Sequence, residues 1–319
     1  MIDGLWYTCC PMPTATALAA RAGLLEAEFG HGEPPLRRLQ DTAGRRLLTH
    51  HFEHGLAGLI REGGNVSALW ARARGAPTRL VALAWGRQYQ AVLARPGSGI
   101  TAPADLAGRT VGVPCSPGRR VDVPAAAALR GFERALHTAG LGLADVRVLT
   151  IPDCSEEITA TGLTADDHRS VAAALATGTV DAIWVRGQAG EAVRDALGAV
   201  EVAALGDHPD PFVRAGDGTP ILITVHADLL EERPDLVIRY LAVLLRATRR
   251  CGETGRALEP GLDGDRLAVL AEQSAFLELH GFIDGHVDLG TWADPRPLQC
   301  AGELAADPRP TIPRQRNRR

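Results

Sequence analysis

The fold class of this chain is decided by the segment Ile100-Thr101-Ala102-Pro103-Ala104-Asp105-Leu106-Ala107-Gly108-Arg109-Thr110-Val111-Gly112-Val113. It predicts a short helix that delivers the chain through Gly108-Arg109 into a new strand. The alternation of helix and strand continues downstream, where we expect a helix over 125–139, a strand over 146–151, a helix over 166–176 and a strand over 178–184. Strands that alternate with helices in this way indicate an α/β protein with mostly parallel sheets covered by helices.

The flanking sequence extends this pattern on both sides. We expect strands over 80–85, 89–93 and 219–225, a short strand or turn over 36–41, and amphipathic helices over 234–249 and 266–279. From about Asp294 onward, proline and charged residues dominate.

Length and composition are those of an ordinary globular protein. With 319 residues, 45% of them hydrophobic and 23% charged, the chain can form two domains with a sizeable core. All 34 basic residues are arginine, which we attribute to mutational bias in a GC-rich bacterial genome. The net charge is −4, and no long basic run precedes the arginine-rich tail at 313–319. The sequence therefore does not indicate a basic surface that binds nucleic acid or an anionic membrane.

The sequence also bears on compartment and metal content. No charged segment followed by an apolar stretch and a cleavage site opens the chain, and no apolar run approaches the roughly 20 residues that span a bilayer. The six cysteines have neither C-x-x-C spacing nor a paired zinc pattern, so we expect no metal site. We therefore expect a cytoplasmic protein with free thiols.

A reactive thiol is indicated by the stretch Tyr7-Thr8-Cys9-Cys10-Pro11-Met12-Pro13-Thr14. Pro11 and Pro13 suit the first turn of a helix that continues through Ala20, which places Cys10 at about the N-cap. The partial positive charge of a helix start favours a thiolate and lowers the thiol pKa from its unperturbed value of about 8.5. The alternative is that Cys10 is simply a small buried residue.

A second stretch joins a histidine-rich loop around His51 to a candidate anion site at Arg61-Glu62-Gly63-Gly64-Asn65. The helical spacing that follows puts Gly63, Gly64 and Asn65 at a helix N-terminus, where backbone amides can bind an anion and glycine permits close approach. Arg61 can add a bidentate guanidinium for a carboxylate, sulfinate or phosphate. Taken alone, these residues also fit a turn, a surface arginine and a partly exposed histidine.

Several short sequence motifs resemble those of proteins with a known fold. They are Ile100-Thr101, Asp105-Leu106-Ala107-Gly108-Arg109 and Gly178-x-Val180-Asp181-Ala182, which are similar to the second domain of the bacterial substrate-binding proteins for sulfonate, nitrate, taurine and thiamine precursors. The resemblance covers most of the chain and implies a two-lobed periplasmic-binding-protein type II fold, each lobe a mixed, mostly parallel sheet flanked by helices, with the active-site cleft between the lobes. It implies lobe 1 at 1–94 and 218–319 and lobe 2 at 95–217. Because this fold is often monomeric, we expect a monomer.

Three further motifs resemble the 2'-hydroxybiphenyl-2-sulfinate desulfinase family, whose members cleave an aryl carbon–sulfur bond and release sulfite. They are Tyr7-x-x-Cys10-Pro11-x-Pro13, His51-Phe52 and Arg61-x-Gly63-Gly64. The resemblance implies that Cys10, His51 and Arg61 are catalytic and that Gly64 presents a backbone amide to the sulfinate. The other predicted substrate-binding residues are Gly63, Cys9, Asn65 and Arg186. Because aromatic residues make up only 4% of the chain, the pocket is predicted to differ from one that holds a biphenyl.

The leading hypothesis is a cofactor-free hydrolytic desulfinase, or a related carbon–sulfur lyase, that acts on a small anionic sulfinate. Cys10 either attacks sulfur or protonates the carbon that bears sulfur, while His51 tunes the thiol and orients water or the leaving group. Two alternatives remain open: a non-enzymatic binding protein for a small organosulfur or other anion, and a thiamine-pyrimidine-synthase-like protein with cysteines near its ligand. No nucleic acid, membrane, metal or cofactor is predicted as a partner.

Overall fold

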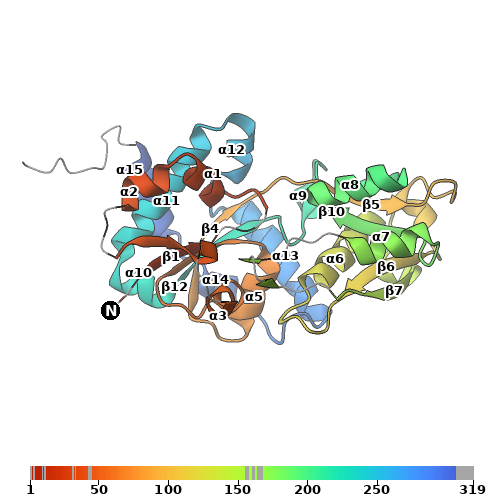
Figure 1. Cartoon of the computed structure of the whole chain (residues 1–319), viewed down its shortest axis with the longest axis horizontal. Coiled ribbons are helices and arrows are strands. Elements are labelled where there is room, and N and C mark those ends of the chain that lie inside the picture. Colours follow the sequence, from red (N-terminus) through yellow and green to blue (C-terminus); the bar gives the residue numbers. More distant parts are fainter. Residues whose placement is uncertain are drawn as a thin grey trace, which may run out of the picture.

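The computed structural model describes residues 2, 4–8, 10, 12–30, 32, 34–41, 45–154, 158–159, 162–163 and 168–306. Within them the chain forms two five-stranded sheets and a two-stranded one, flanked by helices (Figure 1). The N-terminal and C-terminal parts of the chain lie together in one lobe, and the middle part, drawn in yellow and green, forms the other. The α/β architecture expected from the alternating pattern and the two lobes implied by the resemblance are both present.

The first lobe contains a sheet with the strand order β2-β1-β3-β12-β4. Its strands are β1 (Leu5–Thr8), β2 (Leu36–Arg38), β3 (Leu59–Gly63), β4 (Thr78–Ala84) and β12 (Ile221–His226). β1 pairs in parallel with β2 and β3, whereas β12 runs antiparallel between β3 and β4.

Both ends of the chain supply helices around this first sheet. The N-terminal ones are α1 (Ala15–Arg21), α2 (Leu24–Phe29), the 3-10 turn η1 (Leu39–Asp41), α3 (Arg45–Leu48), α4 (His50–Glu53) and α5 (Asn65–Ala73). The C-terminal ones are α10 (Ala227–Glu232), α11 (Pro234–Arg249), α12 (Gly252–Leu258), α13 (Gly264–Leu279), α14 (Leu289–Trp292) and α15 (Arg296–Ala306).

The second lobe contains a sheet with the order β11-β5-β10-β6-β7. Its strands are β5 (Gln90–Ala94), β6 (Thr110–Cys115), β7 (Arg147–Pro152), β10 (Ala182–Arg186) and β11 (Val200–Ala204). In the segment that follows β7, β8 (Ile158–Thr159) pairs with β9 (Gly162–Leu163), and both contact α3 of the first lobe. Its helices are α6 (Val123–His137), α7 (Arg169–Ala176), α8 (Gly187–Leu197) and α9 (Pro211–Arg214), with 3-10 turns η2 (Pro103–Leu106) and η3 (Leu143–Asp145). None of the helices in the described ranges has the length and apolar character needed to cross a bilayer.

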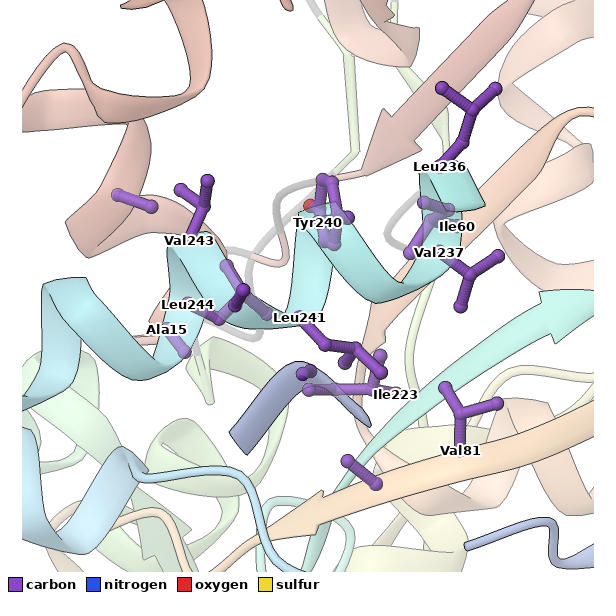
Figure 2. Packing of buried hydrophobic residues seen from close by; sticks show 14 of the residues in the cluster. Ala15, Ile60, Val81, Ile223, Leu236, Val237, Tyr240, Leu241, Val243 and Leu244 are labelled. Atoms are coloured by element: carbon purple, nitrogen blue, oxygen red, sulfur yellow. The ribbon is translucent and has the colours of Figure 1, made fainter. Parts of the chain in front are cut away.

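The core of the first lobe is organised by α11. Its apolar face, which includes Val237, Tyr240 and Leu241, is fully buried and packs toward strand residues such as Ile223 (Figure 2). Burial of each such side chain contributes about 1.5–3 kcal/mol to stability. The hydroxyl of Tyr240 lies 2.8 Å from Thr16 Oγ1, so α1 is joined to the same core.

Most expected elements are present, with their ends displaced by a few residues. α11 has the predicted bounds, and β4, β5, β7, β10 and β12 lie where strands were expected. α15 was not assigned from the sequence, because the prolines around it suggested irregular structure. Pro297 lies in the first turn of that helix. Backbone N–H groups in a first turn have no partner within the helix, so the N–H that proline lacks costs no hydrogen bond.

The predicted division of the chain at residue 94 requires a correction. β5 ends at Ala94, yet it pairs with β10 and β11 and therefore belongs to the second sheet. The chain crosses between the sheets earlier, in the segment 85–89 that separates β4 from β5. The boundary depends on which strands β5 pairs with. The sequence pattern of a single strand does not reveal its neighbours in the sheet.

A buried carboxylate ties β3 to α1. Glu62 is 1% exposed, and its Oε1 and Oε2 accept hydrogen bonds from the backbone N–H groups of Ala15 and Thr16 at 3.0 and 2.6 Å. Amides in the first turn of a helix have no partner within the helix, and a negative charge there is favourable. Glu62 therefore fixes the start of α1 and, with it, the chain that follows Cys10.

Replacing Glu62 with alanine is expected to lower the free energy of unfolding by about 3 kcal/mol, because two buried N–H groups lose their acceptor. Urea denaturation measures this loss. Glu231→Ala, at an exposed position on α10, is the matched control and is expected to change stability by less than about 0.5 kcal/mol. Equal losses in the two variants would contradict the assignment.

Candidate active site

A cavity of about 910 Å³ lies between the two lobes. The first lobe contributes Cys10, His51, Arg61 and Gly64 to its walls, and the second contributes Arg186. Five of the predicted site residues therefore meet in one cavity, although they are spread over more than half of the chain. Cys9 lies outside the described residues.

Cys10 lies between two backbone amides. Its side chain is half-buried, and its sulfur accepts hydrogen bonds from the N–H groups of Met12 and Gly64. The expectation that Cys10 occupies a helix N-cap is wrong. α1 begins at Ala15, and its N-cap is Thr14, whose hydroxyl accepts a hydrogen bond from the N–H of Ala17. A threonine hydroxyl is a good N-cap acceptor, so the helix starts at that residue.

The surroundings of Cys10 favour the protonated thiol. Burial raises the pKa of the thiol above its ordinary value, and the negative charge of Asp217 acts in the same direction. The amide of Met12, the charge of Arg61 and the amide of Gly64 oppose this shift without reversing it. The lowered pKa expected from a helix start is therefore wrong. Cys10 rests as a thiol, while a thiolate formed there would meet two amides and a guanidinium.

Arg61 is a buried cation on β3. It is 1% exposed, its Nε donates to the carbonyl oxygen of His51 at 2.7 Å, and its Nη2 donates to that of Gly64 at 3.1 Å. Nη1 has no hydrogen-bond partner within the described part of the chain, and Arg61 lines the cavity. Burial lowers the pKa of Arg61, but a guanidinium remains charged in proteins.

Gly63 and Asn65 support the site without lining the cavity. A Cβ on Gly63 would lie 3.2 Å from Arg61 Nη2, so glycine leaves room for the guanidinium. Asn65 is fully buried, and its Nδ2 donates to the carbonyl oxygens of Gly216 and Pro220 at 2.6 and 3.1 Å. That these two residues contact substrate stays a prediction, while in the structure their side-chain positions serve Arg61 and the 216–220 loop.

His51 lies on α4 beside the cavity as a neutral imidazole. Its side chain is 4% exposed and its ring packs edge-on against Phe52. Burial lowers the pKa of His51 well below its ordinary value, and the nearby charges of Arg61 and His54 add to this effect. Nδ1 has no hydrogen-bond partner among the described residues. No group of three or more His, Cys, Asp or Glu in that part of the chain could hold a metal ion.

Asp217 is a charged cavity residue that the sequence did not indicate. Its Oδ1 accepts from the N–H of Val66 at 3.1 Å, and its Oδ2 accepts from Arg186 Nη1 at 3.0 Å. The residue lies 151 positions from Val66, in a loop between β11 and β12. No local motif marks such a contact, so the sequence carried no signal for it. Arg186 lines the cavity as a partner of this carboxylate.

Known proteins are similar to this chain over nearly its whole length. A 2'-hydroxybiphenyl-2-sulfinate desulfinase from Rhodococcus erythropolis is 29% identical over 92% of this chain and 92% of that protein. The crystal structure of the desulfurization enzyme DszB aligns over 95% of this chain and 99% of that one, with a TM-score of 0.70 and 26% identity. A cysteine-to-serine variant of DszB in complex with biphenyl-2-sulfinic acid also aligns with a TM-score of 0.70. The resemblance inferred from the three motifs is confirmed.

The fold itself is shared more widely. The periplasmic aliphatic sulphonate-binding protein SsuA from Escherichia coli aligns over 91% of each chain with a TM-score of 0.64, and its 17% identity shows a common fold alone. The predicted periplasmic-binding-protein architecture is therefore confirmed. The model of the NMT1/THI5-like proteins matches residues 63–254, which is more than half of the chain. The chain thus belongs to the NMT1/THI5-like family.

Proposed function

We propose that the protein is a cysteine-dependent desulfinase that hydrolyses the carbon–sulfur bond of a small organic sulfinate and releases sulfite. The observation that carries this proposal is the meeting of the Cys10 thiol with the buried guanidinium of Arg61 in one cavity. Similarity to a sulfinate desulfinase over 92% of the chain supports the same chemistry.

Arg61 is the proposed ligand of the sulfinate. Arg61 lines the cavity, its Nη1 has no hydrogen-bond partner in the described part of the chain, and its other nitrogens are fixed by two carbonyl oxygens. A charge-assisted hydrogen bond from such a group to a sulfinate oxygen is stronger than one between neutral groups. The amide of Gly64, predicted to hold the sulfinate, is directed at the sulfur of Cys10. We assign it to the stabilisation of the thiolate.

Cys10 acts in this proposal as the proton donor. The thiol proton passes to the carbon that bears sulfur, the electron pair of the carbon–sulfur bond forms the new carbon–hydrogen bond, and sulfur leaves as sulfur dioxide. The amides of Met12 and Gly64 and the charge of Arg61 stabilise the thiolate that remains. Water then adds to sulfur dioxide to give hydrogen sulfite. Neutral His51 accepts the proton of that water and returns it to the thiolate, so sulfinate and water yield the desulfinated product and hydrogen sulfite.

Cys10→Ser is expected to lower sulfite release by at least about a thousandfold, because a hydroxyl is a much weaker acid than a thiol. A panel of aryl and alkyl sulfinates, assayed without added metal, measures the loss. Cys300→Ser, at an exposed position on α15, is the control and should retain full activity. Full activity in Cys10→Ser would contradict the proposal. Binding of sulfinates by both proteins without turnover would favour a binding protein, and iron-dependent activity would favour the thiamine-pyrimidine-synthase-like alternative.

The pH profile separates the two roles considered for Cys10. Because the pKa of Cys10 is raised, a proton donor predicts a kcat/KM that is constant through neutral pH and falls only on the alkaline side of the ordinary thiol pKa. Because the pKa of His51 is lowered, no loss is expected near the ordinary histidine pKa. Initial rates of sulfite release across pH test both statements. A rate that climbs from neutral to alkaline pH would instead indicate a nucleophilic thiolate.

Arg61→Lys is expected to lower kcat/KM by about a hundredfold, because an ammonium cannot contact two carbonyl oxygens and the substrate in the geometry of a guanidinium. In a Cys10→Ser background, calorimetric titration with benzenesulfinate should show the corresponding loss of affinity. Arg250→Lys, at an exposed position that follows α11, should leave both quantities unchanged. Unaltered affinity in Arg61→Lys would remove Arg61 from the sulfinate site.

A further inference from the structure

The charges inside the cavity nearly cancel. Arg186 is paired with Asp217, with 3.0 Å between Nη1 and Oδ2, and both side chains are largely buried. Arg119 faces Asp153 at 3.7 Å, again with both side chains largely buried. Arg61 has no acidic group at salt-bridge distance among the described residues, although the charge of Asp217 is close enough to affect it. The interior therefore offers one positive charge in excess.

The other charged residues that line the cavity toward its mouth are exposed or half-buried. The side chains of Arg38 and Arg87 are 42% and 60% exposed, and their acidic partners lie at 3.5 and 3.9 Å. Arg21 is exposed, and Glu191 on α8 is half-buried. Solvent and salt screen charges in such positions, so they contribute little to the field inside.

Asp217 is held firmly beside the anion site. It is 5% exposed, its carboxylate is fixed by Val66 and Arg186, and its carbonyl oxygen accepts the N–H of Asn65 at 2.8 Å. A Cβ at Gly64 would collide with the carboxylate, so the two residues are in contact. Gly64 in turn contacts both Arg61 and Cys10. A ligand bound to Arg61 therefore lies close to a fixed negative charge that cannot move away.

We propose that Asp217 is a specificity-determining residue that restricts this cavity to singly charged anions. An anion of charge −1 neutralises the excess charge of Arg61, whereas an anion of charge −2 leaves a buried negative charge next to the Asp217 carboxylate. Buried like charges repel each other strongly because little solvent separates them. The restriction deepens the proposed function and rests on it for its biological meaning.

The restriction to singly charged anions distinguishes the substrate from the product by charge. A sulfinate carries one negative charge at all physiological pH values. Hydrogen sulfite also carries one charge when it forms, but above neutral pH it loses a proton to become the sulfite dianion. The Asp217 carboxylate then repels the sulfite dianion in the site. This repulsion promotes the release of sulfite and limits inhibition by sulfite or by sulfate.

The first test uses the unaltered protein and needs no turnover. Methanesulfonate and sulfate are both tetrahedral oxyanions of similar size, and they differ by one unit of charge. Calorimetric titration above neutral pH is expected to show methanesulfonate binding at least about tenfold more tightly than sulfate. Tighter binding of sulfate would overturn the proposal. Because only binding is measured, the result is independent of whether sulfinates are hydrolysed.

The second test removes the charge and keeps the shape. Asp217→Asn retains an oxygen that can accept from Val66, and it is expected to reduce the preference for methanesulfonate over sulfate by about tenfold. Asp207→Asn is the matched control, because Asp207 faces the exposed Arg87 at the mouth and should leave the preference unchanged. Thermal unfolding of each variant checks that it is folded. An unchanged preference in folded Asp217→Asn, or an equal change in both variants, would overturn the proposal.

Discussion

The buried guanidinium of Arg61 is the constraint on which the rest of the site depends. A charge held away from water without an acidic partner is costly, and it is tolerated only when its hydrogen-bond donors are used. Two of them are used by the carbonyl oxygens of His51 and Gly64, which joins α4 and the start of α5 to β3. The position of the histidine and of the amide beside Cys10 thus follows from how one cation is accommodated. The N–H groups of Nη1 have no partner among the described residues and are left for a ligand.

The environment of Cys10 favours the thiol at rest and also contains groups that stabilise a thiolate. Burial and a nearby carboxylate keep the proton on Cys10 at rest. The same cavity holds two amides directed at the sulfur and a cation close enough to affect it, so charge that develops there is met without rearrangement. This combination suits a group that has to give up a proton during a reaction and recover it afterwards. A permanent thiolate would require the balance of these effects to be reversed.

Much of the fold and part of the site could be predicted from sequence, and the physical reasons differ. The alternation of strands and helices is local, and so is the Gly63-Gly64-Asn65 start of α5, which the structure places at Asn65 with Gly64 as N-cap. The start of α1 was misplaced because two prolines outweighed Thr14 as a capping signal. Asp217 could not be found, since its contacts with Val66 and Arg186 depend on how distant segments meet.

The alternating faces of β3 limit how this protein can vary. Successive residues of a strand point to opposite sides, so Arg61 reaches the cavity while Glu62 reaches the amides of α1. An insertion or deletion of a single residue within the strand would exchange the two, placing a carboxylate where an anion binds and a guanidinium against amide donors. Both errors would arise from one event, and neither could be repaired by a substitution elsewhere. Relatives that keep this chemistry should therefore differ in length in their loops and preserve the length of this one strand.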